Sequence, residues 1–108
     1  MKYEAQVYIS ILGKSYYDDW FRKLAPNVAA KITTAVHRLT AGHESNTKFL
    51  HAGVWEYKID AGPGYRIYYG KVGKNVILLL AGGTKRNQQI DIELAIELLK
   101  EYKKRALH

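Results

Sequence analysis

Apolar and charged residues alternate from position 54 to position 60, which is the pattern of a strand with one buried face. The buried side of this strand would carry Trp55, Tyr57 and Ile59. The turn residues Gly62-Pro63-Gly64 follow, and residues 65–72 return to strand composition. After a second turn, the continuous apolar run at 76–81 is typical of a central strand that is covered on both faces. The pattern predicts three consecutive antiparallel strands.

The first forty residues predict one strand and two helices. Residues 6–12 alternate in the manner of an opening strand that ends at Gly13. Ser15 can cap a helix that ends before Pro26, and Pro26 suits the first turn of a second helix that continues to Gly42. The apolar face of the first helix consists of Tyr17, Trp20, Phe21 and Leu24. This stripe favours core packing over a base-stacking role, and the two helices would form an antiparallel hairpin.

A closing helix is predicted after Asn87, which can serve as its cap. Its apolar surface is widened by Ile90, Leu94, Ile96 and Leu98. One core contact does not need so broad a surface, so the second side would pack either within the domain or against a partner. The whole chain, residues 1–108, has the length of a single domain with one core.

The charge balance narrows the class of partner. The chain has 17 Lys and Arg against 10 Asp and Glu, a net charge of +7, which makes polyanions and above all nucleic acid the natural partners. A basic surface that serves only solubility explains the charge equally well. No run has a signal-peptide core or the length to span a membrane, and there is no cysteine. We therefore expect a cytoplasmic protein without a membrane partner.

The residue pattern predicts neither a metal site nor a cofactor site. The histidines are His37, His43, His51 and His108. They lack the paired helical spacing and the accompanying carboxylates of a metal site. The glycine-rich segments 61–64 and 82–83 match neither a phosphate-binding P-loop nor a dinucleotide fingerprint. We expect neither a metal nor a cofactor.

The remaining candidate chemistry is a set of cations on the predicted sheet, namely Lys58, Arg66, Lys85 and Arg86. Strand alternation places Tyr68 beside Arg66 and puts Arg66 on the polar face of its strand. An arginine can bind a phosphate through two hydrogen bonds, and a lysine can neutralise a leaving oxygen or exchange a proton. The set therefore suits phosphoryl chemistry, but residue chemistry alone favours a passive phosphate-binding patch.

A longer motif carries a family resemblance. It comprises Gly53-Val54-x-Glu56-x-Lys58-Ile59-Asp60-x-Gly62-Pro63-Gly64-Tyr65-Arg66-Ile67-Tyr68 and then Leu78-Leu79-Leu80-Ala81-Gly82-Gly83-x-Lys85-x-x-Gln88-x-x-Asp91-Ile92-x-x-Ala95. This motif resembles the HigB-type addiction-module killer proteins of the RelE/ParE toxin superfamily. The helix that contains Trp20 and Leu24 is also similar to the amino-terminal part of that family, so the resemblance covers almost the whole chain.

The resemblance implies an α+β fold in which a RelE-like antiparallel sheet has an N-terminal helical hairpin on one face and a C-terminal helix beside the other. It also implies the toxin of a type II toxin-antitoxin system. Such a toxin is a metal-independent endoribonuclease, or mRNA interferase, which cuts mRNA on the ribosome and inhibits translation. Its partners would be the ribosome, mRNA and a cognate helix-turn-helix antitoxin.

The resemblance also implies roles for individual residues. Arg66 matches the functional arginine of the family and Lys85 matches the lysine after its paired glycines, so both are expected to be catalytic. The expected substrate-binding residues are Lys58, Tyr68, Arg86 and Gln88. The chain departs from the family pattern at Lys58, where arginine is usual, and at Thr84, where aspartate is usual. Two other functions stay open: a gyrase-inhibiting ParE-like toxin and a non-catalytic RNA-binding regulator.

Overall fold

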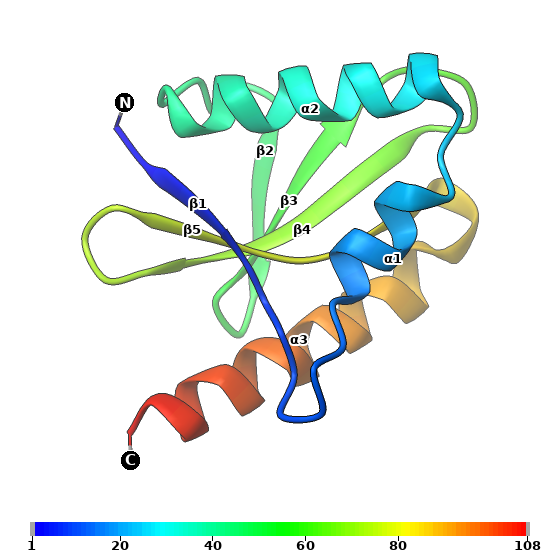
Figure 1. The fold of residues 1–108 in the computed structure, drawn as a ribbon. Helices are drawn as coiled ribbons and strands as arrows, with labels where there is room; N and C mark the ends of the chain where they lie inside the picture. Colours follow the sequence, from blue (N-terminus) through cyan, green and yellow to red (C-terminus); the bar gives the residue numbers. More distant parts are fainter. Residues whose placement is uncertain (1, 108) are drawn as a thin grey trace.

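The computed structural model describes residues 2–107, which form a five-stranded sheet with helices on both faces (Figure 1). The elements are β1 (Glu4–Val7), α1 (Tyr16–Arg22), α2 (Pro26–Thr40), β2 (Thr47–His51), β3 (Val54–Ile59), β4 (Tyr65–Val72), β5 (Val76–Thr84), the short 3₁₀ helix η1 (Lys85–Asn87) and α3 (Gln88–Ala106). The strand order across the sheet is β1-β5-β4-β3-β2. None of the helices in this described part is both long and apolar enough to cross a membrane.

The sheet is mixed, which corrects the expectation of a purely antiparallel one. The predicted antiparallel core of β3, β4 and β5 is confirmed, but β1 pairs in parallel with β5, with Glu4 opposite Val76. The opening strand also lies earlier than predicted, at Glu4–Val7, because the chain turns where Ser10 accepts hydrogen bonds from the backbone N–H groups of Gly13 and Lys14. Two parallel strands need a long crossover connection between them, and here residues 8–75 provide it.

The predicted helix starts are largely confirmed. The Ser15 hydroxyl accepts a hydrogen bond from the Asp18 N–H group at 3.1 Å, and Pro26 occupies the first turn of α2. Asn87 does precede α3, but its side chain makes no capping hydrogen bond.

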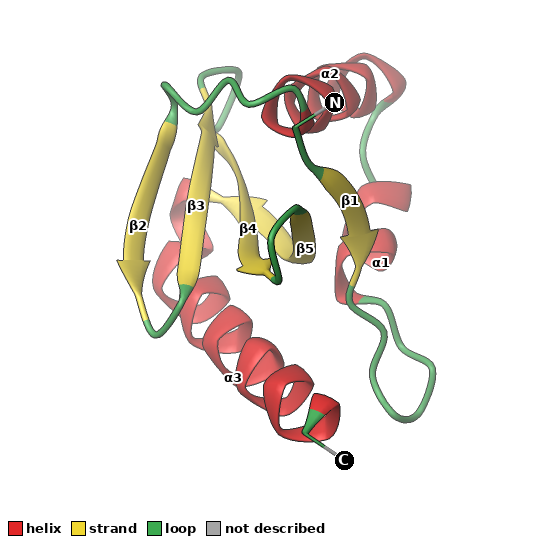
Figure 2. Ribbon diagram, turned by 90° about the vertical axis from the view of Figure 1, so that its left-hand side faces the viewer, coloured by secondary structure: helices red, strands yellow, loops and turns green. Residues whose placement is uncertain are grey.

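The two sides of the sheet are covered by different helices, as predicted (Figure 2). The core beneath α1 and α2 contains Tyr17, Ile32, Ala35, Leu39, Tyr57, Ile67, Tyr69, Ile77 and Leu79. The core beneath α3 contains Tyr8, Val54, Tyr68, Leu78, Leu80, Ala95, Leu98 and Leu99. Trp20 and Phe21 pack against the first core, so the aromatic stripe of α1 serves core packing.

Most of the broad apolar surface of α3 is used within the domain. Leu98 is buried, and Leu94 and Ile96 pack at the margin of the core beneath α3. Ile90 is the exception, since 69% of its surface is exposed. The two sides of α3 therefore do not require a partner to be covered, apart from one residue at its start.

A bulge in β5 determines which helix each later residue of the strand faces. Tyr69 lies opposite Leu79 and Tyr68 lies opposite Ala81, so Leu80 has no partner on β4. An extra residue of this kind shifts the alternation of all positions that follow it in the strand.

The paired glycines that follow the bulge make close contacts on opposite faces of the sheet. A Cβ atom at Gly82 would overlap the ring of Trp20 from α1, and a Cβ atom at Gly83 would overlap the carboxyl group of Asp91 from α3. Both helices therefore approach the β5 backbone more closely than any other residue type permits at these positions.

Asp91 is held against Gly83 without a hydrogen-bond partner for its buried Oδ2 atom. Burial raises the pKa of this carboxyl group above its ordinary value, because the charged form is less well solvated there than in water. The folded state therefore binds the Asp91 proton more tightly than the unfolded chain does.

Gly82→Ala should lower the free energy of unfolding by about 1–3 kcal/mol, because the added methyl group overlaps the Trp20 ring. Urea unfolding followed by circular dichroism measures the change. In a Trp20→Leu background the same substitution should have a smaller effect, because the shorter side chain leaves room. Equal losses in both backgrounds would show that contact with Trp20 is not the cause.

Asp91→Asn should change the pH dependence of stability. Because the folded pKa is raised, the stability that Asp91 supplies is fully present below the unfolded pKa of about 3.8 and is lost as the pH rises through the folded pKa. The variant should therefore gain stability relative to the wild type as the pH rises above about 3.8, as measured by urea unfolding at each pH. Asp60→Asn controls for removal of an exposed carboxylate. Parallel curves for Asp91→Asn and the wild type would contradict this account.

Candidate functional site

The Gly-Pro-Gly turn holds the two predicted catalytic residues at one point. The Gly64 carbonyl accepts a hydrogen bond from Arg66 Nη1 at 3.0 Å and another from the Lys85 backbone N–H group at 2.9 Å. A side chain at Gly64 would crowd this arrangement, since a Cβ atom there would lie 3.2 Å from Arg66 Nη1, and its φ of +77° already favours glycine. The turn therefore joins the start of β4 to the end of β5.

Arg66 is on the predicted face of its strand but is not exposed there. Its partners in the sheet are Lys58 on β3 and Gly83 on β5, and this is the face that α3 covers. Only 5% of its surface is accessible, which corrects the expectation of a side chain on an open polar face. The cause is tertiary, because the segment that covers this face lies some twenty residues later in the chain.

Glu56 is the partner of Arg66 that the sequence analysis did not assign. The distance from Arg66 Nε to Glu56 Oε2 is 3.6 Å, and less than a tenth of each side chain is exposed. This contact is too long for a good hydrogen bond, and Nε has no other partner. The alternation that places Lys58 on the polar face of β3 places Glu56 there as well, so the sequence carries a signal for this carboxylate.

Gln88 links this pair to the first turn of α3. Its Nε2 atom donates a hydrogen bond to Glu56 Oε2 at 2.8 Å. In the free protein Gln88 therefore makes a structural contact with a buried carboxylate. Its substrate-binding role stays a prediction.

Tyr68 lies in the core beneath α3 and has no accessible surface. Burial raises the pKa of its hydroxyl group, and the neighbouring carboxylates of Glu56 and Asp91 raise it further. The phenol therefore stays neutral at physiological pH, and its oxygen has no hydrogen bond of ordinary geometry. As placed, this side chain cannot reach a substrate unless α3 moves.

The other predicted cations form an exposed rim around this buried group. Lys58, Lys85 and Arg86 are all exposed, and Lys58 makes one long ion pair with Asp60 at 3.6 Å. The arrangement has two layers: exposed cations that can attract a phosphate, and behind them a guanidinium held by a carbonyl and a carboxylate. Within residues 2–107, no group of three or more His, Cys, Asp or Glu side chains is placed to hold a metal ion.

Comparison with known proteins places this site within a family. Residues 19–103 match the family described as phage-derived protein Gp49-like (DUF891), and that range includes every predicted site residue. An uncharacterized protein of Haemophilus influenzae is 36% identical over 86 residues, which cover 79% of this chain and 87% of the relative. The chain therefore belongs to the phage-derived Gp49-like family (DUF891), a RelE-like family of toxin-antitoxin systems.

Proposed function

We propose that this protein is a HigB-type toxin of a type II toxin-antitoxin system that cleaves mRNA on the ribosome and thereby inhibits translation. The observation that carries the proposal is the Gly64 carbonyl, which binds both the Arg66 guanidinium and the Lys85 backbone beside an exposed cationic rim. Family membership supports the toxin class. The nuclease activity is our inference from the chemistry of the two cations.

In the proposed reaction the 2′-hydroxyl oxygen of the RNA attacks the adjacent phosphorus and the bond from phosphorus to the 5′ oxygen breaks. The proton of the 2′-hydroxyl passes to a basic side chain, and the leaving 5′ oxygen takes up a proton. Arg66 and Lys85 stabilise the negative charge that builds on the phosphate oxygens. The products are a 2′,3′-cyclic phosphate end and a 5′-hydroxyl end.

Access to Arg66 requires a local movement in this scheme. The guanidinium is almost wholly covered and is already paired with Glu56, which is itself tied to Gln88. A shift of η1 and the first turn of α3 would break the bond from Gln88 to Glu56 and open a path to the guanidinium. An incoming phosphate would then compete with the carboxylate for Arg66.

A second candidate function has one observation in its favour. Burial of Arg66 behind the exposed cations is also what a non-catalytic RNA-binding regulator would show, since its guanidinium would serve only to hold the sheet. The exposed Lys58, Lys85 and Arg86 would then bind RNA without cutting it.

Production of the protein without its antitoxin should arrest growth, and the purified protein should cut mRNA mainly while ribosomes translate it. Mapping of mRNA ends in a reconstituted translation system measures this. A supercoiling assay with gyrase is run in parallel. Intact message together with inhibited supercoiling would favour a ParE-like toxin, and RNA binding without either effect would favour the regulator.

Lys85→Ala should lower the cleavage rate at least several-fold with little loss of stability, because Lys85 is exposed and Arg86 can replace part of its charge. Lys74→Ala, which removes an exposed lysine from the turn between β4 and β5, is the matched control. Single-turnover cleavage on ribosomes measures both, and the new ends should carry 2′,3′-cyclic phosphate. An equal rate in the two variants, or 3′-hydroxyl ends, would refute the mechanism.

Arg66→Ala should lower the cleavage rate about a hundredfold or more. The structure adds a stability effect, because truncation leaves the Glu56 carboxylate buried without its ion-pair partner. The rate is therefore compared with that of Glu56→Gln, which also breaks the ion pair but keeps the guanidinium. If both variants fold and their cleavage rates fall by the same factor, Arg66 acts through the fold alone.

A further inference from the structure

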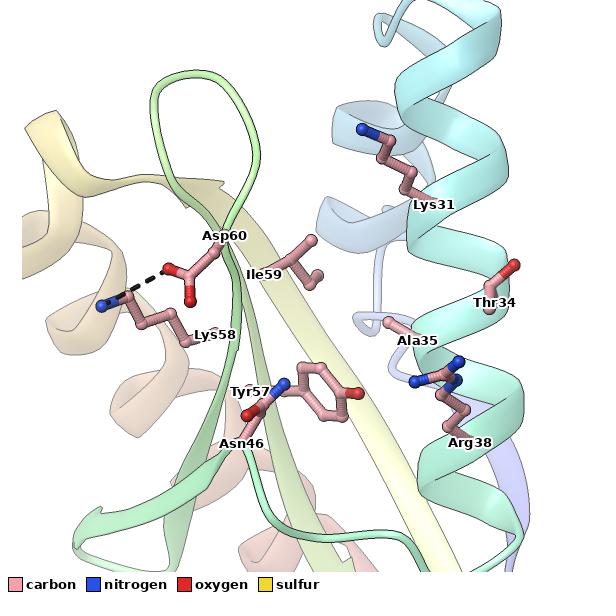
Figure 3. Close-up of a pocket in the computed structure, with 9 residues that line it drawn as sticks. All are labelled: Lys31, Thr34, Ala35, Arg38, Asn46, Tyr57, Lys58, Ile59 and Asp60. Atoms are coloured by element: carbon pink, nitrogen blue, oxygen red, sulfur yellow. Dashed lines mark ion pairs between the residues drawn. The ribbon is translucent and has the colours of Figure 1, made fainter.

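A groove separates α2 from β3 on the face of the sheet opposite to Arg66 (Figure 3). Its volume is about 280 Å³, and Lys31, Arg38 and Tyr57 are among the residues that line it, together with Lys58 of the exposed rim. A second hollow of about 400 Å³ lies next to it along α2 and shares Lys31 with it. The groove therefore extends along the helix towards the turn that follows β3.

One face of α2 supplies the positive charge of the groove. Lys31, Thr34 and Arg38 lie three and four residues apart, so they project from the same side of the helix. Seven residues separate the two cations, which is about two helical turns or roughly 10 Å along the axis. The ion pairs of the described chain include neither cation. The acidic residue of the groove, Asp60, is paired with Lys58.

Neutral hydrogen-bonding groups lie beside these cations. The ring of Tyr57 is buried in the core, while its hydroxyl group points across the groove towards Arg38, and Asn46 lies nearby (Figure 3). No hydrogen bond of the Tyr57 hydroxyl is found within residues 2–107. A phenol, an amide and two unpaired cations around one hollow are suited to bind an oxyanion.

We propose that this groove binds the phosphate backbone of an RNA strand. The spacing of the groove's cations along α2 suits contacts with more than one phosphate of a strand. The inference rests on the proposed RNA-directed function, and it assigns a second RNA contact between α2 and β3, which Lys58 of the exposed rim also borders.

An acidic protein segment fits the groove less well than RNA does. Protein interfaces depend on aromatic or aliphatic anchors in buried pockets. The large exposed apolar side chains of the described chain are Ile9, Ile11, Leu12, Phe49, Ile90 and Leu107. None of them lines the groove, whose apolar lining consists of small or partly covered side chains and the buried ring of Tyr57. Phosphate contacts need cations and polar donors but no such anchor.

The test measures binding of 2′-O-methyl RNA, which lacks the attacking hydroxyl group and cannot be cut. The double variant Lys31→Ala/Arg38→Ala is compared with Lys100→Ala/Lys104→Ala, which removes two exposed lysines from α3. Fluorescence anisotropy at several salt concentrations gives the affinity and its salt dependence. A single strand and a stable hairpin are used as separate probes, because a message and a folded RNA present the same phosphates differently.

The groove variant should bind RNA about tenfold or more weakly. The slope of log affinity against log salt concentration should become shallower by about 1.4 for a single strand, if two phosphate contacts disappear. The α3 variant should lose much less. Tyr57→Phe should weaken binding a few-fold with the slope unchanged, because it removes a neutral hydrogen bond. Tighter binding of the single strand would identify message as the ligand, and tighter binding of the hairpin would identify folded RNA.

Equal losses in the groove and α3 variants would overturn the proposal, since charge alone would then explain binding. Tighter binding of a poly-glutamate peptide than of either RNA, lost in the groove variant, would overturn it in favour of an acidic protein partner. Failure of the wild-type protein to cut ribosome-bound mRNA would refute the nuclease but not this result, because the uncleavable probes report binding only.

Discussion

A buried guanidinium requires partners, and the way Arg66 obtains them determines how this small domain is assembled. Leaving such a charge unpaired away from water would cost several kcal/mol. Arg66 donates to the Gly64 carbonyl and faces the Glu56 carboxylate, which also accepts a hydrogen bond from Gln88. These contacts connect a turn, two strands and the first turn of α3. The same side chain that is expected to act on RNA thus helps to hold the closing helix against the sheet.

The paired glycines allow close packing on both faces of one strand. Without side chains at Gly82 and Gly83, Trp20 and Asp91 can contact the β5 backbone from opposite sides. In this structure the two glycines allow close packing of two helices. Lys85 is the first residue after the end of β5. Family motifs that contain such glycines can therefore reflect helix packing as much as contact with a ligand.

The two cationic surfaces meet at Lys58 and differ in the chemistry that they can support. On the α3 side, exposed cations surround a buried group that can stabilise charge once it becomes accessible. On the α2 side, Lys31 and Arg38 border a groove without comparable buried polar chemistry. Under the proposed function such a division would help, because binding energy remote from the reacting bond can position that bond.

Local patterns in the sequence predicted the parts of this structure that depend on near neighbours. Alternation placed Trp55 and Tyr57 on one side of β3 and Glu56 on the other. The Ser15 cap placed the start of α1, and Pro26 placed the start of α2. These features depend on backbone periodicity and on hydrogen bonds within a few residues. The motif also indicated the RelE-like toxin class, in which the Gp49-like family falls, while the HigB type stays a prediction.

Only the tertiary structure decided what covers each surface. Parallel pairing of β1 with β5, burial of Arg66 beneath α3, its pairing with Glu56 and the groove beside Tyr57 all depend on segments far apart in the chain. Alternation shows which side chains share a face, but a face is exposed or buried according to the element that packs on it. That choice is made by the sum of many weak contacts over the whole domain, so no short stretch of sequence contains it.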